Sequence, residues 1–265
     1  LVRAKVVQRF GGRLKAFVSG GAPLNYDVGV FFMALGLRLL QGYGQTESAP
    51  LISINRYALN KIETVGPPVK DVDVRIAGDG EILVCGELLM NGYWNNPRAT
   101  AETIVDGWLH TGDIGSFDDD GCLMITDRKK DIIVNSGGDN ISPQRVEGML
   151  TVEPEIGQAM VYGDRQPHLV ALIVPDEDFV SAWGKDHEGD ADITALITDK
   201  DFIKAIDDAV RRVNAKLTAP ERVRRFVLAA DGFTIDNEML TPSLKIRRHV
   251  IKEKYGEALN ILYGG

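Results

Sequence analysis

The chain has 265 residues, of which 44% are hydrophobic and 26% are charged. This composition is that of a folded globular protein and excludes a disordered chain, and the length allows one large domain or two of ordinary size. The formal net charge of −8 excludes a nucleic-acid backbone as the main partner, because phosphate binding requires a concentrated positive surface.

The two cysteines, Cys85 and Cys122, have neither the spacing of a metal site nor that of a disulfide framework, so the cytoplasm is the default compartment. The longest apolar stretch, Val28–Leu40, is interrupted by Gly and Arg and is shorter than the roughly 18 residues that cross a bilayer. No transmembrane helix is therefore predicted. The chain begins Leu-Val-Arg-Ala-Lys, without an initiator methionine or a signal-peptide pattern, and we expect a fragment or a processed product.

The first predicted elements are a strand, a helix and a second strand. The apolar run Leu14–Ser19 predicts a short buried strand, which Gly20–Pro23 follows as a turn. Asn25 is a suitable N-cap for a helix that reaches about Leu35, and Leu37–Leu40 predicts the second strand. This order is typical of an α/β layer, and its strands need further neighbours to complete a sheet.

The pattern from residue 65 to residue 127 changes to short alternating runs separated by Gly, Asp and Asn, which predicts a β-rich subdomain. Its expected strands include Val72–Ile76, Glu81–Cys85 and Cys122–Thr126. Asp118–Gly121 predicts a hairpin turn, because Asp and Gly tolerate positive φ angles. The acidity of this turn also suggests calcium, but the downstream glutamate of a calcium loop is absent.

The remainder of the chain predicts a separate α+β unit. Ser142 before Pro143 is a good helix start, and the helix should bury Val146 and Leu150. Two strands, one long amphipathic helix and a closing helix come next. The expected strands are Gln158–Tyr162 and Leu169–Val174, the long helix is Asp201–Leu217 with Phe202, Ile206, Ala209, Val213 and Leu217 facing the core, and the closing helix carries Ile251, Tyr255, Leu259 and Leu262 on one side.

The predicted fold class is therefore α/β and α+β multidomain. Residues 1–127 supply a partial α/β layer and the β-rich subdomain, and residues 128–265 supply a hinge and a small C-terminal α+β domain.

Five polar segments, four of which contain or adjoin glycine, together suggest nucleotide handling. In the first, Ser19–Leu24, the backbone at Gly21 and Ala22 can approach a flat ligand closely, although an ordinary strand-to-helix turn also explains this composition. The second, Gln41–Glu47, is expected at the exit of an apolar strand, where α/β sheets commonly place their ligand sites.

The second segment offers a ring, a hydroxyl and a carboxylate. Tyr43 is suited to lie against a base, Thr46 to bond a phosphate oxygen, and Glu47 to hold magnesium, which prefers oxygen ligands and bound phosphates. The alternative interpretation is an ordinary loop with an exposed acid.

The other three segments are less specific when each is taken alone. Asp113, within Gly107–Gly115, can accept hydrogen bonds from both hydroxyls of a ribose, but a Gly-Asp pair is usually a turn. The charged run Asp127–Asp131 before a glycine loop could form a hinge or a solvated linker. Lys245, in a loop before the closing helix, can neutralise charge that develops on a transferring group, although most surface lysines have no such role.

Taken in order, the five segments resemble those of the adenylate-forming superfamily, which contains acyl-CoA synthetases, luciferases and peptide-synthetase adenylation domains. The resemblance covers almost the whole chain. The runs Met160–Asp164, Ala171–Asp176 and Leu240–Lys245 resemble the long-chain fatty acid–CoA ligase branch in particular.

The resemblance implies a two-step reaction that uses a fatty acid, ATP, Mg²⁺ and CoA. The acid first forms an acyl-adenylate with release of pyrophosphate, and the thiol of CoA then displaces AMP. By position in the family's motifs, the adenine-binding residues are Gly21, Ala22, Gln41, Gly42 and Tyr43, the phosphate and magnesium contacts are Thr46 and Glu47, and the ribose contacts are Asp113 and Arg128.

The same resemblance assigns roles to the C-terminal domain. Lys245 corresponds to the lysine of the adenylation step, and Lys130 to the hinge about which the mobile domain rotates. The loop Ser136, Gly137 and Gly138 then serves the thioester step. The family often works at membrane surfaces, so the expected location is cytoplasmic or peripheral at the inner face of a membrane, while the oligomeric state and the acyl chain length stay open.

Two departures from the family pattern are visible. No stretch resembles the Ser/Thr/Gly-rich phosphate loop followed by proline and lysine, so we expect the chain alone to bind nucleotide poorly and to catalyse little. Asp139 stands where many long-chain relatives have lysine. The alternatives are an aryl or medium-chain CoA ligase, an adenylation enzyme that loads a carrier protein, and a non-catalytic pseudoenzyme fragment.

Overall fold

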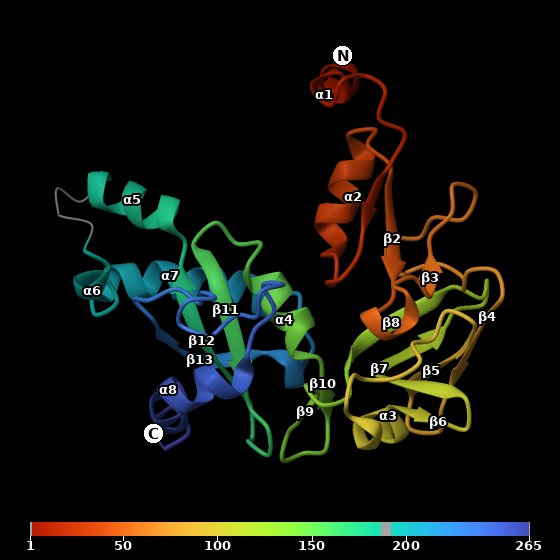
Figure 1. Ribbon diagram of the computed structural model, residues 1–265. Helices are drawn as coiled ribbons and strands as arrows, with labels where there is room; N and C mark the ends of the chain where they lie inside the picture. The colour runs from red at the N-terminus through yellow and green to blue at the C-terminus, as the bar shows by residue number, and fades with distance from the viewer. Residues whose placement is uncertain (1, 187–191, 265) are drawn as a thin grey trace. The chain divides into compact units, whose positions relative to one another are not determined.

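The computed structural model describes residues 2–186 and 192–264. The chain forms two compact units, Leu1–Lys130 and Asp131–Gly265. The fold is the predicted mixture of α/β and α+β architecture, and Figure 1 shows the elements along the chain.

The first unit opens with α1 (Val2–Arg9) and a small three-stranded sheet of β1 (Phe17–Ser19), β2 (Leu39–Tyr43) and β3 (Ser53–Ile54). The strands β1 and β2 are parallel and are connected by α2 (Tyr26–Ala34), which confirms the predicted α/β order. The side chain of Asn25 caps α2 by accepting a hydrogen bond from the Val28 amide at 3.2 Å. Gly36 follows with a φ of +83°, a conformation that ends a helix well because glycine has no Cβ.

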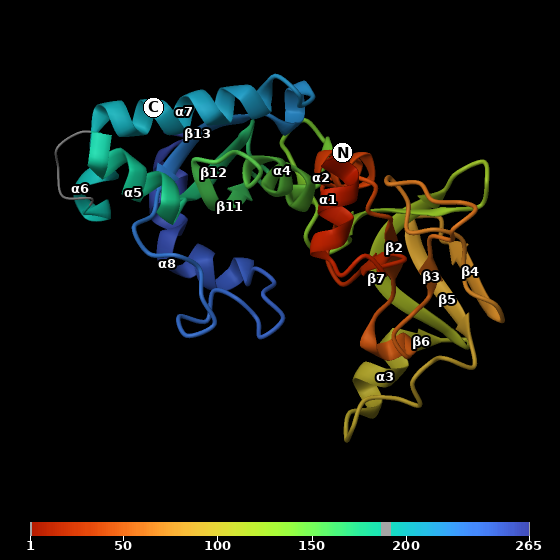
Figure 2. The same ribbon diagram turned by 90° about the horizontal axis from the view of Figure 1, so that it is seen from above.

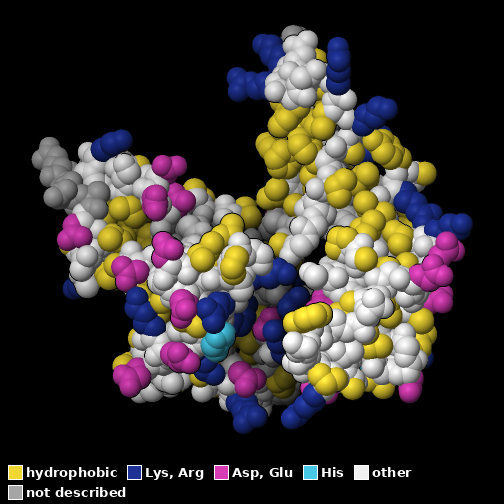
Figure 3. Space-filling view, in the orientation of Figure 1, with side chains coloured by type: hydrophobic (Ala, Val, Ile, Leu, Met, Phe, Trp, Pro, Cys, Tyr) yellow, Lys and Arg dark blue, Asp and Glu magenta, His cyan; other side chains and the backbone are white. Residues whose placement is uncertain are grey.

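Two details of the predicted layer are wrong. The first strand has only three residues and is not buried, since Val18 is 67% exposed. The second strand begins and ends later than predicted, so that Gln41, Gly42 and Tyr43 lie within β2 and not at its exit. Apolar side chains on α2 are also exposed, and Figure 3 shows hydrophobic side chains gathered over this helix. They include Tyr26, Val30, Phe31 and Met33.

The rest of the first unit is the predicted β-rich subdomain. Its five strands are β4 (Val72–Ile76), β5 (Glu81–Gly86), β6 (Ile104–Val105), β7 (Trp108–Phe117) and β8 (Leu123–Arg128). They pair antiparallel in the order β4-β5-β7-β6, and β8 pairs with the other end of β7. The predicted hairpin turn connects β7 to β8, where Asp118 accepts a hydrogen bond from the Cys122 amide and Lys61 donates to Asp118 at 2.6 Å. One short helix, α3 (Pro97–Thr103), was not predicted.

The second unit is built on a three-stranded sheet of β11 (Ile156–Tyr162), β12 (Leu169–Pro175) and β13 (Val223–Leu228), in that order. The strands β11 and β12 are antiparallel, and β12 and β13 are parallel. Ser142 caps α4 (Pro143–Leu150) as predicted, by accepting a hydrogen bond from the Arg145 amide. The other elements of this unit are β9 (Ile133–Val134), β10 (Asn140–Ile141), α5 (Glu177–Asp186), α6 (Ile193–Leu196), α7 (Lys200–Asn214), the 3₁₀ turn η2 (Ala219–Glu221) and α8 (Arg248–Ile261).

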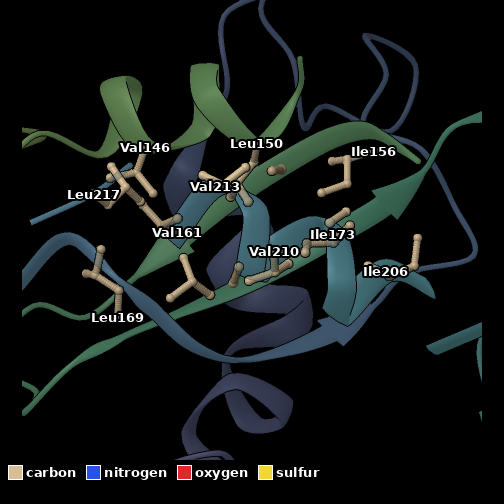
Figure 4. Close-up of a cluster of buried hydrophobic side chains, with 14 of the residues drawn as sticks. Val146, Leu150, Ile156, Val161, Leu169, Ile173, Ile206, Val210, Val213 and Leu217 are labelled. Carbon is tan, nitrogen blue, oxygen red and sulfur yellow. The ribbon is translucent and has the colours of Figure 1, made fainter. Parts of the chain in front are cut away.

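Both faces of this sheet are covered, as Figure 2 shows with α7 and α8 on opposite sides. One core contains α4 and α7 residues together with alternate residues of β12, and Figure 4 shows how these side chains interdigitate. The other core contains the remaining β12 residues and α8. Every residue of β12 is buried, so this strand is a continuous apolar run. Among residues 2–186 and 192–264, no helix has both the length and the apolar character needed to cross a bilayer.

Candidate functional site

Three residues that are far apart in the sequence meet in the first unit. The hydroxyl of Tyr43 donates a hydrogen bond to Oδ2 of Asp113 at 2.6 Å. Asp113 on β7 is also the register partner of Arg128 on β8, and Nε of Arg128 lies 3.4 Å from Oδ1 of Asp113. Tyr43 and Asp113 are buried, with exposed fractions of 8% and 6%, whereas the Arg128 side chain is one-third exposed. The second, third and fourth sequence segments therefore converge on one carboxylate.

The environment of Tyr43 keeps it in the protonated form. Burial raises the pKa of its phenol well above the usual range, and the charge of Asp113 and the hydrogen bond to that carboxylate add to the effect. The tyrosine therefore acts as a permanent hydrogen-bond donor to Asp113, and together with Arg128 it fixes the direction of the carboxylate.

Glycines bring the backbones of the first two segments close together. A Cβ on Gly20 would lie 3.1 Å from the carbonyl oxygen of Gly42, and a Cβ on Gly44 would lie 1.8 Å from the carbonyl oxygen of Pro50. Gly21 has a φ of +83° and begins the turn that contains Ala22. The exit of β1 and the strand β2 thus lie side by side, as parallel neighbours in a sheet require.

The side chain of Gln41 has a structural role that its position in the motif did not indicate. Its side chain is buried, and its amide nitrogen donates to the carbonyl oxygens of Ile62 and Thr64. Asn55 donates to the same Thr64 carbonyl at 2.7 Å. Gln41 therefore holds the loop around Thr64 against β2.

The exit of β2 is a short 3₁₀ turn, η1 (Thr46–Ser48). Ser48 closes it by donating to the carbonyl of Gln45 at 2.9 Å and accepting from the Gln45 amide. Gln45 also donates from its side chain to the carbonyl of Thr111 at 3.3 Å, which ties the turn to β7. Thr46 is exposed at the start of the turn.

The carboxylate of Glu47 is oriented by a residue that sequence reasoning missed. Tyr93 donates to Oε1 of Glu47 at 2.9 Å, and the Met90 amide donates to the Glu47 carbonyl at the same distance. Burial and this hydrogen bond raise the pKa of Tyr93. Nothing in the run Asn91–Trp94 distinguishes this tyrosine from an ordinary loop residue.

This donor set fits a magnesium ion that arrives with a phosphate-bearing ligand. Within the described residues, Oε2 of Glu47 accepts no hydrogen bond, so one carboxylate oxygen is available beside the exposed hydroxyl of Thr46. Magnesium commonly uses one or two protein carboxylates and takes its other ligands from phosphates and water. In the same part of the chain, no group of three or more His, Cys, Asp or Glu residues is placed to hold a metal by itself.

A cluster of ion pairs fixes the end of the first unit. Lys129 lies 2.6 Å from Asp79 and 3.1 Å from Glu81, and its amide donates to the carbonyl of Gly112. Burial alone raises the pKa of Glu81, but hydrogen bonds from Lys129, the Gly112 amide and His110 outweigh burial and bring that pKa below its usual value. The boundary between the two units falls immediately after Lys130, which is exposed.

The glycine loop of the second unit connects β9 to β10. Oδ1 of Asn135 accepts from the amides of Gly137 and Asp139, and the Gly138 amide donates to the carbonyl of Asn135. The side chain of Asn135 also donates to the Asp139 carboxylate at 2.9 Å. Asp139 therefore closes this loop internally, and Ser136 is tied to the Gln166 carbonyl through its amide.

Lys245 lies in a compact turn between the sheet and α8. Its amide donates to Oγ1 of Thr241 at 3.0 Å, while the Thr241 amide donates to the Lys245 carbonyl at 2.8 Å. Leu244 has a φ of +60°, which a residue with a side chain adopts only when its surroundings impose it. Lys245 is exposed and closes the turn opposite Thr241.

The structure thus brings four of the predicted groups together in the first unit: the turn after β1, the β2 segment, Asp113 and Arg128. The glycine loop and Lys245 belong to the second unit. The sequence motifs contain Gln45, Thr111 and Lys129 but gave them no role, and Tyr93 lies outside the motifs, because each of these residues acts through a partner distant in sequence.

Comparisons with known proteins place both units in one family. Residues 2–94 match the family described as AMP-binding enzyme, and residues 130–265 match the AMP-binding enzyme C-terminal domain. The chain is similar to the long-chain-fatty-acid–CoA ligase FadD15 of Mycobacterium bovis, with 41% identity over 99% of this chain and 44% of that protein. It is also similar to human long-chain-fatty-acid–CoA ligase 1, with 34% identity over 99% of this chain and 40% of that protein.

Solved structures show the same architecture. The adenylation domain of a carboxylate reductase from Mycobacterium chelonae matches with a TM-score of 0.79 and 25% identity, over 99% of this chain and 41% of that one. The adenylation and carrier didomain of a carboxylic acid reductase from Segniliparus rugosus, in complex with AMP, matches with a TM-score of 0.77 and 26% identity, over 99% and 36%. This chain therefore spans about two fifths of the length of its relatives, and with both family matches in sequence order it belongs to the AMP-binding, adenylate-forming enzymes.

Proposed function

We propose that this chain supplies the C-terminal portion of a long-chain fatty acid–CoA ligase, which activates its acid with ATP and transfers the acyl group to CoA. The activity belongs to a polypeptide of the relatives' length that contains this chain. The observation that carries the proposal is the convergence of Tyr43 and Arg128 on the buried Asp113 carboxylate, in a chain 41% identical to a ligase of that name.

Asp113 and Arg128 are proposed to bind the ribose of the nucleotide. A carboxylate whose direction is fixed by a buried tyrosine and an arginine can accept hydrogen bonds from vicinal hydroxyls without reorganising. The adenine would lie against the adjoining backbone of the first two segments, where glycine allows a close approach. That face is formed by Gly21, Ala22, Gly42 and Tyr43, with Gln41 acting from beneath through the loop that it holds.

Thr46 and Glu47 are proposed to contact the phosphates and a magnesium ion. The turn η1 presents both residues at the exit of β2, and Tyr93 holds one oxygen of Glu47 so that the other is directed elsewhere. When bound, magnesium would neutralise phosphate charge and thereby favour departure of pyrophosphate.

The first half-reaction joins the acid to AMP. A carboxylate oxygen of the fatty acid attacks the α-phosphorus, the bond from that phosphorus to the bridging oxygen of pyrophosphate breaks, and acyl-adenylate forms. Lys245 is proposed to donate hydrogen bonds to the oxygens that gain charge in this step, a role suited to a cationic group on an exposed turn.

The second half-reaction transfers the acyl group. The sulfur of CoA attacks the acyl carbon, the bond from that carbon to the AMP oxygen breaks, and the thiol proton leaves to solvent or to a base. We propose that Lys130 is the hinge about which residues 131–265 rotate between the two steps, and that Ser136, Gly137 and Gly138 serve the second step. The unit boundary directly after Lys130 and the internally bonded glycine loop support this division of labour.

A specific observation supports one alternative function. The solved structures with the same architecture include adenylation domains of carboxylic acid reductases, whose names describe the reduction of an acid and not its ligation to CoA. A panel of acids of different length and type, tested for adenylation and for CoA ester formation, separates these functions. We also propose a cytoplasmic enzyme that works peripherally at a membrane, because long-chain acids partition into bilayers.

The test compares Lys245→Ala with Lys216→Ala, which removes another exposed lysine of the same unit. ATP–pyrophosphate exchange dependent on a long-chain acid reports the first half-reaction, and acyl-CoA formation from supplied acyl-adenylate reports the second. We expect Lys245→Ala to lose exchange by about 100-fold and to keep most of the second half-reaction, while Lys216→Ala keeps both. Equal loss of both half-reactions contradicts the role of Lys245, and absence of exchange in the unmodified protein contradicts the proposed function.

A further inference from the structure

We propose that Arg248 is a positioning residue for Lys245, which it holds in place through a buried ion pair with Glu147. This inference rests on the proposed function, because it concerns the adenylation lysine. Its structural part, that the pair fixes the turn Thr241–Lys245, can be tested without any activity.

The ion pair has the geometry of a strong interaction. Nη1 of Arg248 lies 2.7 Å from Oε1 of Glu147, and Nη2 lies 2.6 Å from Oε2, so both oxygens are engaged. Oε1 also accepts a hydrogen bond from the Val161 amide at 2.8 Å. The Glu147 side chain is 8% exposed and that of Arg248 is 22% exposed, so solvent screens the pair weakly.

The pair connects elements that are distant in sequence. Glu147 lies on α4, which follows the glycine loop, and Val161 lies on β11. Arg248 is the first residue of α8 and comes three residues after Lys245. The N-terminus of α8 is therefore anchored to the sheet and to α4 at the point where the lysine turn joins the helix.

The turn itself has few other attachments. Residues 242–245 are exposed, and the backbone bonds between Thr241 and Lys245 close the turn on itself without tying it to the core. Leu240 pairs with Ile246, and the Arg247 amide donates to the carbonyl of Met239, so the base of the turn is a narrow two-stranded neck. The neck packs on the core through Leu240 and Ile246. Arg248, at the start of α8, adds a buried polar anchor and is the first side chain after the neck with a charged partner.

The two segments that the ion pair joins, α4 and the turn Thr241–Lys245, depend on it to different extents. On the α4 side, Val146 and Leu150 are fully buried in the core with β11 and α7, and these contacts hold the helix in place. On the other side, residues 242–245 are exposed, and the core contacts of this segment come from Leu240 and Ile246 in the neck. Removal of the Arg248 side chain should therefore release the lysine turn much more than the glycine loop that precedes α4.

Lys245 would act by stabilising the negative charge that develops on the reacting group, and this stabilisation depends on where the ammonium group lies. A displacement of about 1 Å can cost on the order of 100-fold in rate. The structure accordingly assigns to Arg248 an effect on the rate of adenylation that is transmitted wholly through Lys245. The same effect should be absent when the lysine is absent.

The experiment uses a polypeptide of the relatives' length that contains this chain, with Arg248→Met, Arg248→Lys, Lys245→Ala and the double variant Lys245→Ala/Arg248→Met. Arg247→Met is the matched control, since it removes the neighbouring arginine side chain. Glu147→Gln/Arg248→Met separates loss of the anchor from the effect of leaving the Glu147 charge buried alone. Acid-dependent ATP–pyrophosphate exchange and thioester formation from supplied acyl-adenylate are measured for each.

We expect Arg248→Met to lower the kcat of exchange by about 10- to 100-fold with the KM for ATP changed less than about threefold. Thioester formation and Arg247→Met should stay near wild type, and Arg248→Lys should recover part of the loss. In the Lys245→Ala background, Arg248→Met should cost less than about threefold more, because both changes remove the same action. An undiminished loss in that background, or equal loss of both half-reactions, overturns the proposal.

Hydrogen exchange provides a readout that does not depend on activity. In Arg248→Met, and also in Glu147→Gln/Arg248→Met, the amides of Leu244 and Lys245 should exchange at least about tenfold faster, while those within α4 stay protected. Unchanged protection of the turn overturns the anchoring role even if the enzyme is active. Absence of ATP–pyrophosphate exchange in the unmodified protein would instead refute the proposed function. The hydrogen-exchange result would still test the anchoring role of Arg248 by itself.

Discussion

The hydroxyl of Tyr43 lies 2.6 Å from Oδ2 of Asp113, although the two residues are 70 positions apart in the chain. The bond joins β2 of the small α/β sheet to β7 of the antiparallel sheet, and both residues are buried. It therefore does two things at once: it helps to hold the two sheets of the first unit together, and it aligns the carboxylate proposed to bind ribose.

Tyr43→Phe should reveal both roles. Removing the hydroxyl leaves Asp113 buried with one fewer donor, and an unsatisfied buried group costs about 1–3 kcal/mol of stability. We expect the KM for ATP to rise about tenfold, in line with the loss of roughly 1.4 kcal/mol of binding, and kcat to change less. Urea unfolding and pyrophosphate exchange measure the two effects. Tyr57→Phe is the control, because Tyr57 is exposed, and a similar rise in KM for that variant would contradict the argument.

Glu47→Gln should weaken magnesium dependence specifically. The amide keeps the shape of the side chain and still accepts from Tyr93, but it loses the negative charge that attracts the ion. The magnesium concentration that gives half-maximal exchange should rise several-fold. Titration of exchange rate with magnesium measures this, and Tyr93→Phe should produce a smaller rise because the charge remains. If Glu47→Gln has the wild-type titration curve, Glu47 is not the metal contact.

Gly44→Ala should disrupt the turn that presents Thr46 and Glu47. The added Cβ would lie 1.8 Å from the Pro50 carbonyl oxygen, a distance that forces the backbone to move. We expect loss of most ATP binding together with a stability loss of a few kcal/mol from the imposed strain. Gly78→Ala is the matched control, since its Cβ meets nothing within 4 Å. Nucleotide titration and thermal unfolding of both variants test the prediction, and equal behaviour of the two would contradict it.

Lys129→Met should make the first unit less resistant to acid. Lys129 is among the groups that bring the pKa of Glu81 below its usual value and is the largest cause of the lowering for Asp79. A carboxyl with a lowered pKa contributes stability that is present above its unfolded pKa and is lost as the pH falls through its folded value. The loss should therefore occur below about pH 4.3, the ordinary pKa of glutamic acid.

Without Lys129, the acid unfolding midpoint should move to higher pH, because the lowered pKa values return toward normal. Circular dichroism between pH 2 and about pH 7 monitors the transition. Lys130→Met removes the adjacent exposed lysine and should leave the midpoint unchanged. A shift of equal size in both variants would show that overall charge, and not the Lys129 ion pairs, controls acid stability.

Local patterns predicted the elements whose signals lie within the element itself. The cap at Asn25, the Ser142-Pro143 helix start and the stripe of Phe202 and Ile206 all depend on nearest neighbours along one helix, and each is confirmed. The same is true of the strand Val72–Ile76, whose predicted bounds match the structure.

Elements that form because they pair with strands distant in sequence were missed or misplaced. Gly42 and Gly44 have the character of loop residues, but Gly42 pairs with Ile54 inside β2, where the absence of a side chain allows close strand contact. The strand β13 contains Arg224 and Arg225, which interrupt its apolar pattern, and it exists because β12 offers a parallel edge. Tertiary pairing, which no local window contains, decides both cases.

The site was predictable to the extent that its residues carry family motifs, and those assignments remain proposals about ligands. The supporting residues were not predictable. Tyr93 holds Glu47 across 46 positions, and Arg248 holds Glu147 across 101 positions, so neither pairing leaves a trace in the neighbouring sequence.

The two-sided burial of β12 has a practical consequence for anyone who shortens this protein. Its seven residues, Leu169–Pro175, form an unbroken apolar strand that α7 shields on one face and α8 on the other. A truncation before α8 would remove one of these covers and expose an apolar face of the sheet, and exposed apolar patches of this kind promote aggregation. Such a shortened chain should collect in inclusion bodies, so expression trials should keep the final helix intact.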